Sequence, residues 1–292
     1  MTELMLKEPF ASLWKNSDAF AEARQIQGKI FRAKEGRKTL SFTLQNRNYF
    51  LKYHAGVGWK EIFKNVLQLR LPVLGASNEY HAALELHKLG VATLTPVAFG
   101  KKGFNPARQH SFLITEALEN CSSLEDICKH WPSQKPSFLL KKAVIESVAK
   151  SGRIMHSHGI NHRDYYLCHF LLENDAPEKI RKAESFHCYL IDLHRAGQHK
   201  KLPLRWQIKD LSGLLYSTMD IGLTRRDYFR YIKNYTGLSL RDTFRCDRRL
   251  WLDVVNKACE LYRKDFRKNP PLQFLELQAR LQETGKRLTA NG

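Results

Sequence analysis

The first third of the chain alternates apolar and polar positions with the period of β-strands. Runs rich in aromatic and β-branched residues are separated by short turn-like joints, and the first three runs predict an antiparallel meander. The predicted strands are 29–33, 39–44, 48–53, 94–99 and 111–115. A helix is expected over 78–89, with Ser77 as its N-cap and Gly90 at its end.

From about residue 120 the apolar positions recur with the period of an α-helix. The helical patterns cover 139–159, 205–220, 225–235 and 250–266. Strands followed by helices predict an α+β chain with two lobes. We expect a small N-terminal lobe at 1–118, with an antiparallel sheet and one helix, and a larger helical C-terminal lobe at 119–292.

A polar motif follows the first of these long helices. His162-Arg163-Asp164 lies just beyond its end, and a strand-like apolar run ends 28 residues after Asp164, at Asp192. In protein-kinase-like phosphotransferases the first aspartate of such a pair orients and deprotonates a hydroxyl group, and the second holds Mg²⁺ on the phosphates of ATP. The spacing therefore predicts a bilobal protein-kinase-like fold. The simpler interpretations are a turn aspartate for Asp164 and a strand-end cap for Asp192.

A kinase also needs a cation on the phosphates and a carboxylate that holds this cation in place. Lys52 lies at the end of the third predicted strand, and Glu79 lies in the first turn of the helix that follows. Alone, Lys52 fits equally well as an edge-strand lysine, and Glu79 as a residue that complements the helix dipole. Together with Asp164 and Asp192 they favour an ATP site.

Three features depart from the protein-kinase pattern. His169 stands five residues after Asp164, where an asparagine would bind a second Mg²⁺, and imidazole is a poor Mg²⁺ ligand. Either the second ion is held differently, or one ion suffices, or His169 only orients its neighbours. The first hairpin has Gly36 but no glycine-rich loop, so we expect nearby basic side chains to contact the phosphates. No Ala-Pro-Glu follows downstream, which argues against peptide substrates.

Charge narrows the choice of partner. The chain has 48 Lys and Arg against 29 Asp and Glu, a formal net charge of +19, which implies an anionic partner. Anionic lipid and a phosphorylated substrate fit this charge, whereas no RNA-binding signature, zinc finger or recognition helix supports nucleic acid. No apolar run is long enough to span a bilayer, and the N-terminus does not resemble a secretory signal. Six cysteines without a Cys-x-x-Cys pair predict reduced thiols in a cytoplasmic protein.

Several motifs together resemble one family, the lipopolysaccharide core heptose(I) kinases. They are 162–172, 191–196 and 220–227, with 58–62, 71–76 and 108–112 in the N-terminal part. The resemblance covers essentially the whole chain. It implies transfer of the γ-phosphoryl group of ATP to the 4-hydroxyl of the first heptose of the inner core, on the cytoplasmic side of the inner membrane.

The resemblance also implies residue roles. Lys52 and Glu79 would form the pair that clamps ATP, and Asp164, within its His162-Arg163-Asp164 motif, would be the catalytic base. Asp192 would bind the metal, with His169 as the second candidate ligand, although a histidine here fits the pattern of this family. The backbone from Glu116 to Leu118 would contact adenine. The implied cofactors are ATP and Mg²⁺, and members of the family have been linked to acyl carrier protein as a stabilising partner.

A phosphorylated, acidic lipid acceptor at an anionic membrane surface would explain the basic charge. The candidate contacts are the helical pattern Trp59–Arg70, the cluster Arg263, Lys264, Arg267 and Lys268, and the pair Arg225 and Arg226. Two rival functions remain. The enzyme could phosphorylate the Kdo sugar or another small hydroxyl acceptor, or the chain could be a pseudokinase scaffold that binds anionic lipid or acyl carrier protein. A scaffold would not need the four polar site residues, which favours the enzyme.

Overall fold

The computed structural model describes residues 2–34, 36–56, 58–59, 75–105 and 107–279. The chain divides into two compact units. The first contains Met1–Glu119 and Asp192–Ala196, and the second contains Asn120–Ile191 and Gly197–Gly292. Sheet and helices are distributed as in the predicted α+β, protein-kinase-like fold. The return of 192–196 to the first unit has no counterpart in the sequence pattern.

A six-stranded antiparallel sheet forms the first unit, in the order β1-β5-β6-β4-β3-β2. The strands are β1 (Thr2–Leu6), β2 (Lys29–Lys34), β3 (Arg37–Leu44), β4 (Arg47–His54), β5 (Pro96–Lys102) and β6 (His110–Glu116). The helices are α1 (Phe10–Leu13), α2 (Ala19–Gln25) and α4 (Ser77–Lys88). The predicted meander and the two later strands are confirmed, whereas β1, α1 and α2 were not predicted.

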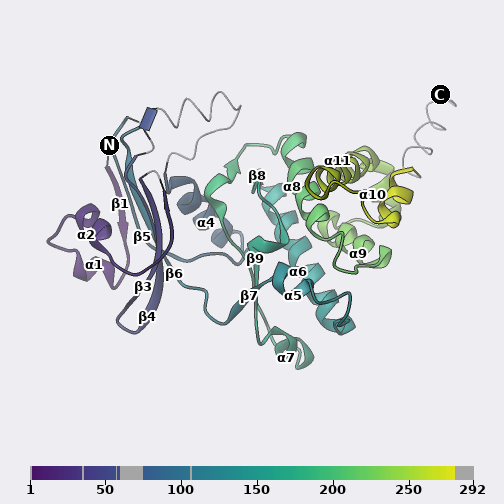
Figure 1. The fold of residues 1–292 in the computed structure, drawn as a ribbon, viewed down its shortest axis with the longest axis horizontal. Helices are drawn as coiled ribbons and strands as arrows, with labels where there is room; N and C mark the ends of the chain where they lie inside the picture. Colours follow the sequence, from purple (N-terminus) through teal and green to yellow (C-terminus); the bar gives the residue numbers. More distant parts are fainter. Residues whose placement is uncertain (1, 35, 57, 60–74, 106, 280–292) are drawn as a thin grey trace. The chain divides into compact units, whose positions relative to one another are not determined.

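The two faces of this sheet carry separate apolar clusters, which follow the period of two in the sequence. Phe112 and Ile114 of β6 pack with the aromatic residues of α1 and α2. Leu113, between them, belongs to the cluster of α4, in which Tyr80 stacks on Phe99 at 4.0 Å. Figure 1 shows α1 and α2 on one side of the sheet and α4 on the other. The strand β4 is therefore covered on both faces.

The predicted N-cap of α4 is wrong. The helix begins at Ser77, and its N-cap is Ala76, whose N–H donates to the Ser111 hydroxyl at 3.0 Å. Ala76 is buried in the same cluster as Tyr80, so packing against the sheet fixes where the helix starts. Among the described residues, the Ser77 hydroxyl is buried and has no hydrogen-bond partner. The predicted end is correct, because Gly90 adopts a left-handed backbone with φ of +74°.

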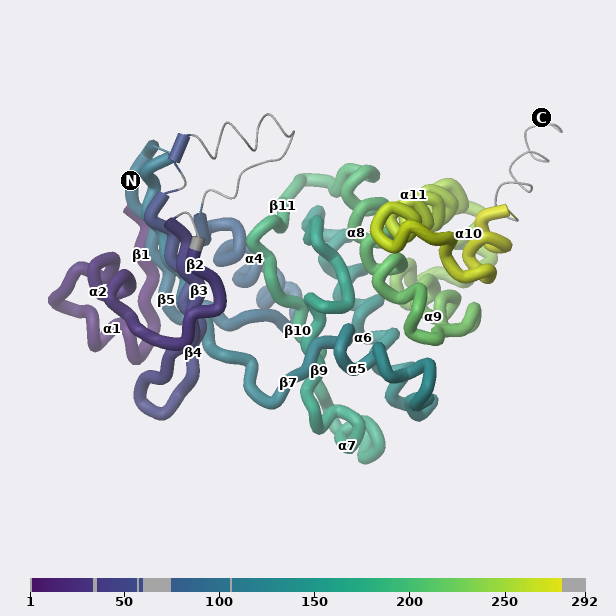
Figure 2. Tube along the Cα trace, viewed as in Figure 1, coloured from purple at the N-terminus to yellow at the C-terminus, as the bar shows by residue number. Residues whose placement is uncertain are grey.

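Helices dominate the second unit, as predicted, and two small antiparallel sheets accompany them. The helices are α5 (Leu124–Cys128), α6 (Phe138–Ser157), α7 (Ala176–Arg181), α8 (Leu204–Ser217), α9 (Arg225–Thr236), α10 (Leu240–Cys246) and α11 (Arg248–Phe266). The strands are β7 (Cys121–Ser123), β8 (Ile160–Asn161), β9 (Phe170–Glu173), β10 (Cys188–Leu190) and β11 (Gly197–Gln198), and short 3₁₀ turns are η1 (Leu167–His169) and, in the first unit, η2 (Leu193–Arg195). Figure 2 shows α11 beside α8 and α9 beside α6, and these pairs enclose the apolar core.

An apolar cavity of about 120 Å³ lies within this helical core. Its walls come from α5, α6, α8, α9 and α11, and Trp131, Val148, Leu214, Phe244 and Val255 are among the residues that line it. Cavities of this size stay dry when apolar and accept apolar ligands. All six cysteines are described and none forms a disulfide.

Most of the predicted basic helix pattern Trp59–Arg70 lies outside the described residues. Within the described ranges, no helix combines the length and apolarity needed to cross a membrane.

The aromatic cluster around Phe112 generates a stability prediction. Phe112 is 0% exposed and makes edge-to-face contacts with Trp14 and Phe20 at 5.9 and 5.2 Å. We expect Phe112→Ala to lower the free energy of unfolding by about 3–5 kcal/mol, because it leaves a cavity. Phe104→Ala is the matched control, since Phe104 is 83% exposed, and should change it by less than about 0.5 kcal/mol. Urea unfolding followed by circular dichroism measures both, and equal effects would contradict the assigned core.

Candidate active site

Lys52 occupies a central position in the first unit. It lies on β4 directly opposite Leu113 of β6, and therefore on the face of the sheet that α4 covers. Its ammonium group donates to both carboxylate oxygens of Glu79, at 2.7 and 2.8 Å. Glu79 lies in the first turn of α4, and its side chain is 1% exposed. The structure thus brings Lys52 and Glu79 together in an ion pair whose carboxylate is buried and whose ammonium is partly exposed.

Asp192 joins this pair from a distant part of the sequence. Its Oδ1 lies 3.6 Å from the Lys52 ammonium nitrogen and 2.5 Å from His194 Nδ1. The backbone of Asp192 is left-handed, with φ of +62°, where the chain leaves β10 and enters η2. The side chain is about one third exposed, so its carboxylate is accessible to a ligand, whereas that of Glu79 is enclosed.

The charges around Lys52 keep it protonated. Burial alone would lower the pKa of Lys52, but the neighbouring carboxylates of Glu79 and Asp192 outweigh burial and raise the pKa above its ordinary value. The side chain is therefore a fixed cation at neutral pH. Such a cation suits the α- and β-phosphates of a nucleotide.

His54 lies on the same face of β4, two residues beyond Lys52, and is 9% exposed. Within the described part of the chain, its Nδ1 is buried without a hydrogen-bond partner. Burial lowers the pKa of His54 to about 4, and the positive charges of Arg37, Lys52 and His194 act in the same direction. His54 is therefore neutral at pH 7. It was not among the predicted site residues, although its alternation with Lys52 on one strand was a usable signal.

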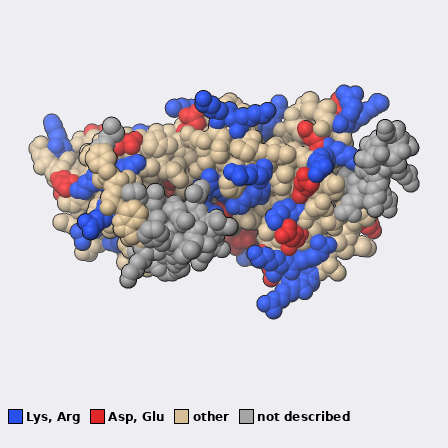
Figure 3. Space-filling model, turned by 90° about the horizontal axis from the view of Figure 1, so that it is seen from above, with Lys and Arg blue, Asp and Glu red and all other residues tan. Residues whose placement is uncertain are grey.

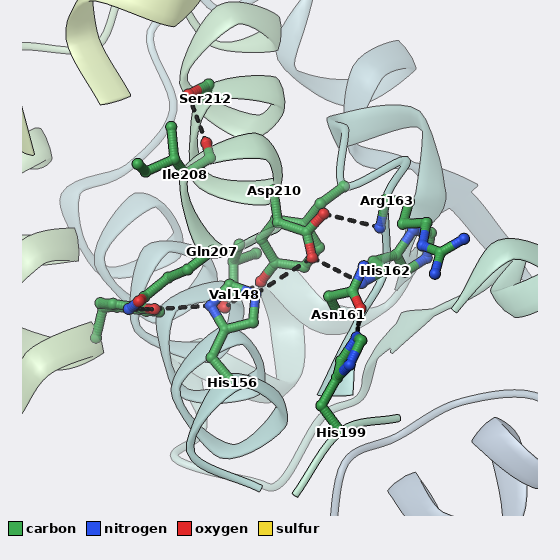
Figure 4. A network of polar contacts seen from close by, with 12 residues as sticks. Val148, His156, Asn161, His162, Arg163, His199, Gln207, Ile208, Asp210 and Ser212 are labelled. Carbon is green, nitrogen blue, oxygen red and sulfur yellow. Dashed lines mark hydrogen bonds and ion pairs between the residues drawn. The ribbon is translucent and has the colours of Figure 1, made fainter. Parts of the chain in front are cut away.

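The His162-Arg163-Asp164 loop of the second unit is held by a buried carboxylate. Asp210 of α8 is 0% exposed and accepts hydrogen bonds from the backbone N–H groups of His162, at 2.6 Å, and Arg163, at 2.7 Å (Figure 4). A buried carboxylate is costly unless it is fully hydrogen-bonded, so α8 and the loop constrain each other. Sequence reasoning missed Asp210. The available signal was an acidic residue on the apolar face of the predicted helix at 205–220.

A chain of side chains continues from Asp210 into the helices. His156 of α6 has its Nε2 3.3 Å from Asp210 Oδ2 and its Nδ1 2.7 Å from the Tyr235 hydroxyl. Gln207 donates its amide N–H to the same hydroxyl oxygen at 2.9 Å. Tyr235 then donates to His156 Nδ1, and the Nε2–H of His156 donates to Asp210. This assignment gives a partner to both ring nitrogens of His156 and to the Tyr235 hydroxyl.

Two histidines orient the loop from its other side. His162 donates from Nε2 to the carbonyl oxygen of Ile191 at 2.8 Å, and His169 donates from Nδ1 to the carbonyl oxygen of Asp164 at 2.6 Å. The two rings stack, with centroids 5.6 Å apart. The hydrogen bond from His169 holds the backbone of Asp164. This favours the alternative that His169 orients its neighbours, one of the three that the sequence left open.

The backbone expected to contact adenine, from Glu116 to Leu118, lies at the end of β6. The backbone N–H of Glu116 donates to the carbonyl of Thr95 at 3.0 Å, and that of Ala117 donates to the carbonyl of Asn48 at 2.9 Å. Both groups are therefore occupied within the first unit. If this stretch binds adenine, the N–H donor has to come from Leu118.

The side chains around Asp192 fit Mg²⁺ in one respect. Mg²⁺ keeps several waters and is usually bound by one or two carboxylates together with substrate phosphates. Among the described residues, no group of three or more His, Cys, Asp or Glu side chains forms a metal site. The accessible carboxylate of Asp192, beside a fixed cation for phosphate, suits this shared mode of binding.

A buried lysine–glutamate pair between a central strand and the next helix, in a chain that also carries a His-Arg-Asp loop, defines the kinase class. The chain belongs to the lipopolysaccharide kinase (Kdo/WaaP) family, whose model matches residues 21–235. The resemblance predicted from the motifs is thus confirmed, as are the phosphotransferase class and the kinase-like fold.

Individual relatives are similar over most of their length. The lipopolysaccharide core heptose(I) kinase WaaP of Pseudomonas aeruginosa is 46% identical over 261 residues, which cover 89% of this chain and 96% of the relative. The protein of the same name from Escherichia coli strain K12 is 50% identical over 236 residues, 81% of this chain and 88% of the relative. A solved structure described as WaaP in complex with acyl carrier protein has a TM-score of 0.77 at 41% identity and covers 89% of this chain and 99% of that one.

The Lys52–Glu79 pair generates a binding prediction. We expect Glu79→Gln to weaken ATP binding at least about tenfold, because a buried ammonium loses its counter-charge and its fixed position. Glu85→Gln, an exposed change on the same helix, is the matched control and should leave ATP affinity unchanged. Isothermal titration calorimetry measures both. Equal affinities for the two variants would show that the pair does not hold the nucleotide.

The low pKa of His54 predicts an acid-sensitive stability. In the unfolded chain His54 takes up a proton below about pH 6.5, whereas in the folded protein it does so only near pH 4. The free energy of unfolding should therefore fall by about 3 kcal/mol as the pH drops from 6.5 to 4. His54 should not affect it above pH 6.5. We expect His54→Gln to lose less stability than the wild type between pH 7 and pH 4. His130→Gln, at an exposed position, is the control. Urea unfolding at a series of pH values measures the free energy of unfolding. If it changed with pH in the His54 variant as it does in the wild type, the assignment would be disproved.

Proposed function

We propose that this protein is an ATP-dependent kinase that phosphorylates the 4-hydroxyl of the first heptose of the lipopolysaccharide inner core. The observation that carries the proposal is the buried Lys52–Glu79 pair with Asp192 at 3.6 Å, in a chain whose relatives are named heptose(I) kinases. A scaffold protein has no need for a lysine held by a buried carboxylate beside a second, accessible carboxylate.

In this proposal the first unit binds the nucleotide. Lys52 contacts the α- and β-phosphates, Glu79 fixes Lys52, and Leu118 contributes a backbone contact to adenine. Asp192 holds Mg²⁺, which neutralises charge on the phosphates when bound. His169 is retained as the weaker metal candidate, because its Nδ1 already donates to the Asp164 carbonyl.

The second unit supplies the catalytic base and binds the acceptor. The Asp164 carboxylate accepts the proton of the heptose hydroxyl as the hydroxyl oxygen bonds to the γ-phosphorus and the bond to ADP breaks. The N–H groups of His162 and Arg163 stay bonded to Asp210 and fix the loop during this step. The helix α8 thus holds the loop that carries the base.

The basic charge supports a peripheral site of action at the cytoplasmic face of the inner membrane. Figure 3 shows a face on which Lys and Arg side chains are more abundant than Asp and Glu. The predicted basic cluster lies at the end of α11, where Arg263, Lys264, Arg267 and Lys268 are all exposed. Each such residue near an anionic surface contributes on the order of 1 kcal/mol. Arg225 and Arg226, exposed in the first turn of α9, remain candidates for acceptor phosphates.

Acyl carrier protein is the proposed protein partner. A relative that is 41% identical is described in complex with it, and an acidic partner would match the net charge of +19. The apolar cavity of the second unit would accept a few methylene groups of an acyl chain. No nucleic acid partner is proposed.

Phosphoryl transfer from labelled ATP to a purified inner-core acceptor tests the function. We expect Asp164→Ala to lower kcat by about 10²–10⁴-fold, because it removes the base and the contact that orients the hydroxyl. Asp175→Ala, at a half-exposed position in the same unit, should retain wild-type turnover.

A second acceptor distinguishes heptose from Kdo as the sugar that is phosphorylated. An acceptor that lacks the heptose but retains Kdo should remain unlabelled. Label on Kdo would assign the protein to the other activity named in its family, and turnover that does not depend on Asp164 would reject the catalytic role.

A further inference from the structure

Three cationic side chains surround a single indole ring in the second unit. Arg163, Arg205 and Lys209 place their charged groups 4.6, 5.1 and 5.5 Å from the ring centroid of Trp206. Contacts of this kind are electrostatically favourable, because the face of an aromatic ring carries partial negative charge. The ring therefore gathers three positive charges that would otherwise repel each other.

The same helix fixes this group relative to the catalytic loop. Asp210 follows Lys209 on α8 and binds the backbone N–H groups of His162 and Arg163. Figure 4 shows the Arg163 guanidinium pointing away from the Asp210 carboxylate. Gly197 lines its other side, because a Cβ atom there would lie 3.1 Å from an Arg163 guanidinium nitrogen. The Arg163 charge therefore has a defined position beside Asp164, its neighbour in the chain.

The local sequence concentrates charge of one sign. The stretch 197–209 contains Lys200, Lys201, Arg205 and Lys209 but no Asp or Glu. Arg205 and Lys209 are four residues apart on α8, and like charges at this spacing destabilise a helix. A bound anion would convert this repulsion into attraction. Guanidinium groups are well suited to it, since they bind carboxylate and phosphate in a bidentate manner.

We propose that Arg163, Arg205 and Lys209, arranged around Trp206, form a binding site for an acidic group of the acceptor, a carboxylate or phosphate on a sugar close to the one that is phosphorylated. The inference rests on the proposed function and adds to it a way of positioning the acceptor hydroxyl. Arg163 adjoins the catalytic base in the chain, so an anion held there orients the neighbouring hydroxyl. Neutral sugars of the same shape would bind poorly at this site.

Kinetics with a soluble, deacylated inner-core oligosaccharide tests the site. We expect the double variant Arg205→Gln, Lys209→Gln to raise the KM for this acceptor roughly tenfold, through loss of charge-assisted hydrogen bonds, while the KM for ATP stays unchanged. Arg249→Gln, with Arg249 90% exposed on α11, is the control for a change in surface charge. An unchanged acceptor KM in the double variant would overturn the proposal.

A chemically altered acceptor identifies the ligand group. Reducing the carboxylates to alcohols and removing the phosphates should raise the wild-type KM to a similar extent, and the double variant should then show no further loss. An equal loss in the variant on both acceptors would overturn the proposal. The proposal would also be overturned if the variant sedimented less with phosphatidylglycerol vesicles but had a normal KM for the oligosaccharide. The three basic residues would then bind the membrane surface and not the acceptor.

A binding measurement keeps this inference separate from the proposed function. The indole N–H signal of Trp206, assigned with Trp206→Phe, should shift and saturate as inorganic phosphate is added to the wild type, and should not shift in the double variant. Saturable phosphate binding in a protein that transfers no phosphate to heptose would reject the function and retain the anion site. Absence of a shift in the wild type would reject the site itself.

Discussion

Asp210 is a buried carboxyl group, and the conformation of the His162-Arg163-Asp164 loop depends on it. Two backbone N–H groups of the His162-Arg163-Asp164 loop and the ring of His156 all point at this one carboxylate. A buried carboxylate that lost these partners would cost several kcal/mol, so the loop has one favourable conformation. The backbone of the loop that carries Asp164 is thereby anchored by a residue 46 positions further along the chain, on α8.

The first unit uses the same principle with the opposite sign of charge. Lys52 is a cation held by an enclosed carboxylate, Glu79, and an accessible one, Asp192. The enclosed partner has no role left except to hold, while the accessible partner is available to a ligand. His54, neutral and next to them, adds a polar group without adding charge. Two carboxylates of similar chemistry beside one lysine thus differ in their access to solvent.

Most of the fold followed from periodicity, and half of the candidate site followed from motif spacing. Lys52 and Glu79 could be paired from the sequence because the third predicted strand has one lysine and Glu79 lies in the first turn of the helix over 78–89. Asp210 could not, since its importance depends on which backbone groups it meets, and an acid on an apolar face is ambiguous alone. Ser77 failed as a cap for a related reason: burial of the preceding residue overrode a local preference. The N-terminal β1, α1 and α2 are short, so their periodicity is too brief to detect, although Asp18 caps α2.

The return of 192–196 to the first unit has a consequence for how the protein is made. Its N-terminal unit is closed by residues that leave the ribosome long after residue 119, once much of the second unit has already been synthesised. Contacts of such high sequence separation form late and slow folding. Until then the nascent chain has the Lys52–Glu79 pair without the Asp192 carboxylate, which lies 3.6 Å from the Lys52 ammonium in the complete unit. Truncation products that end before this segment would accordingly lack the second carboxylate beside Lys52.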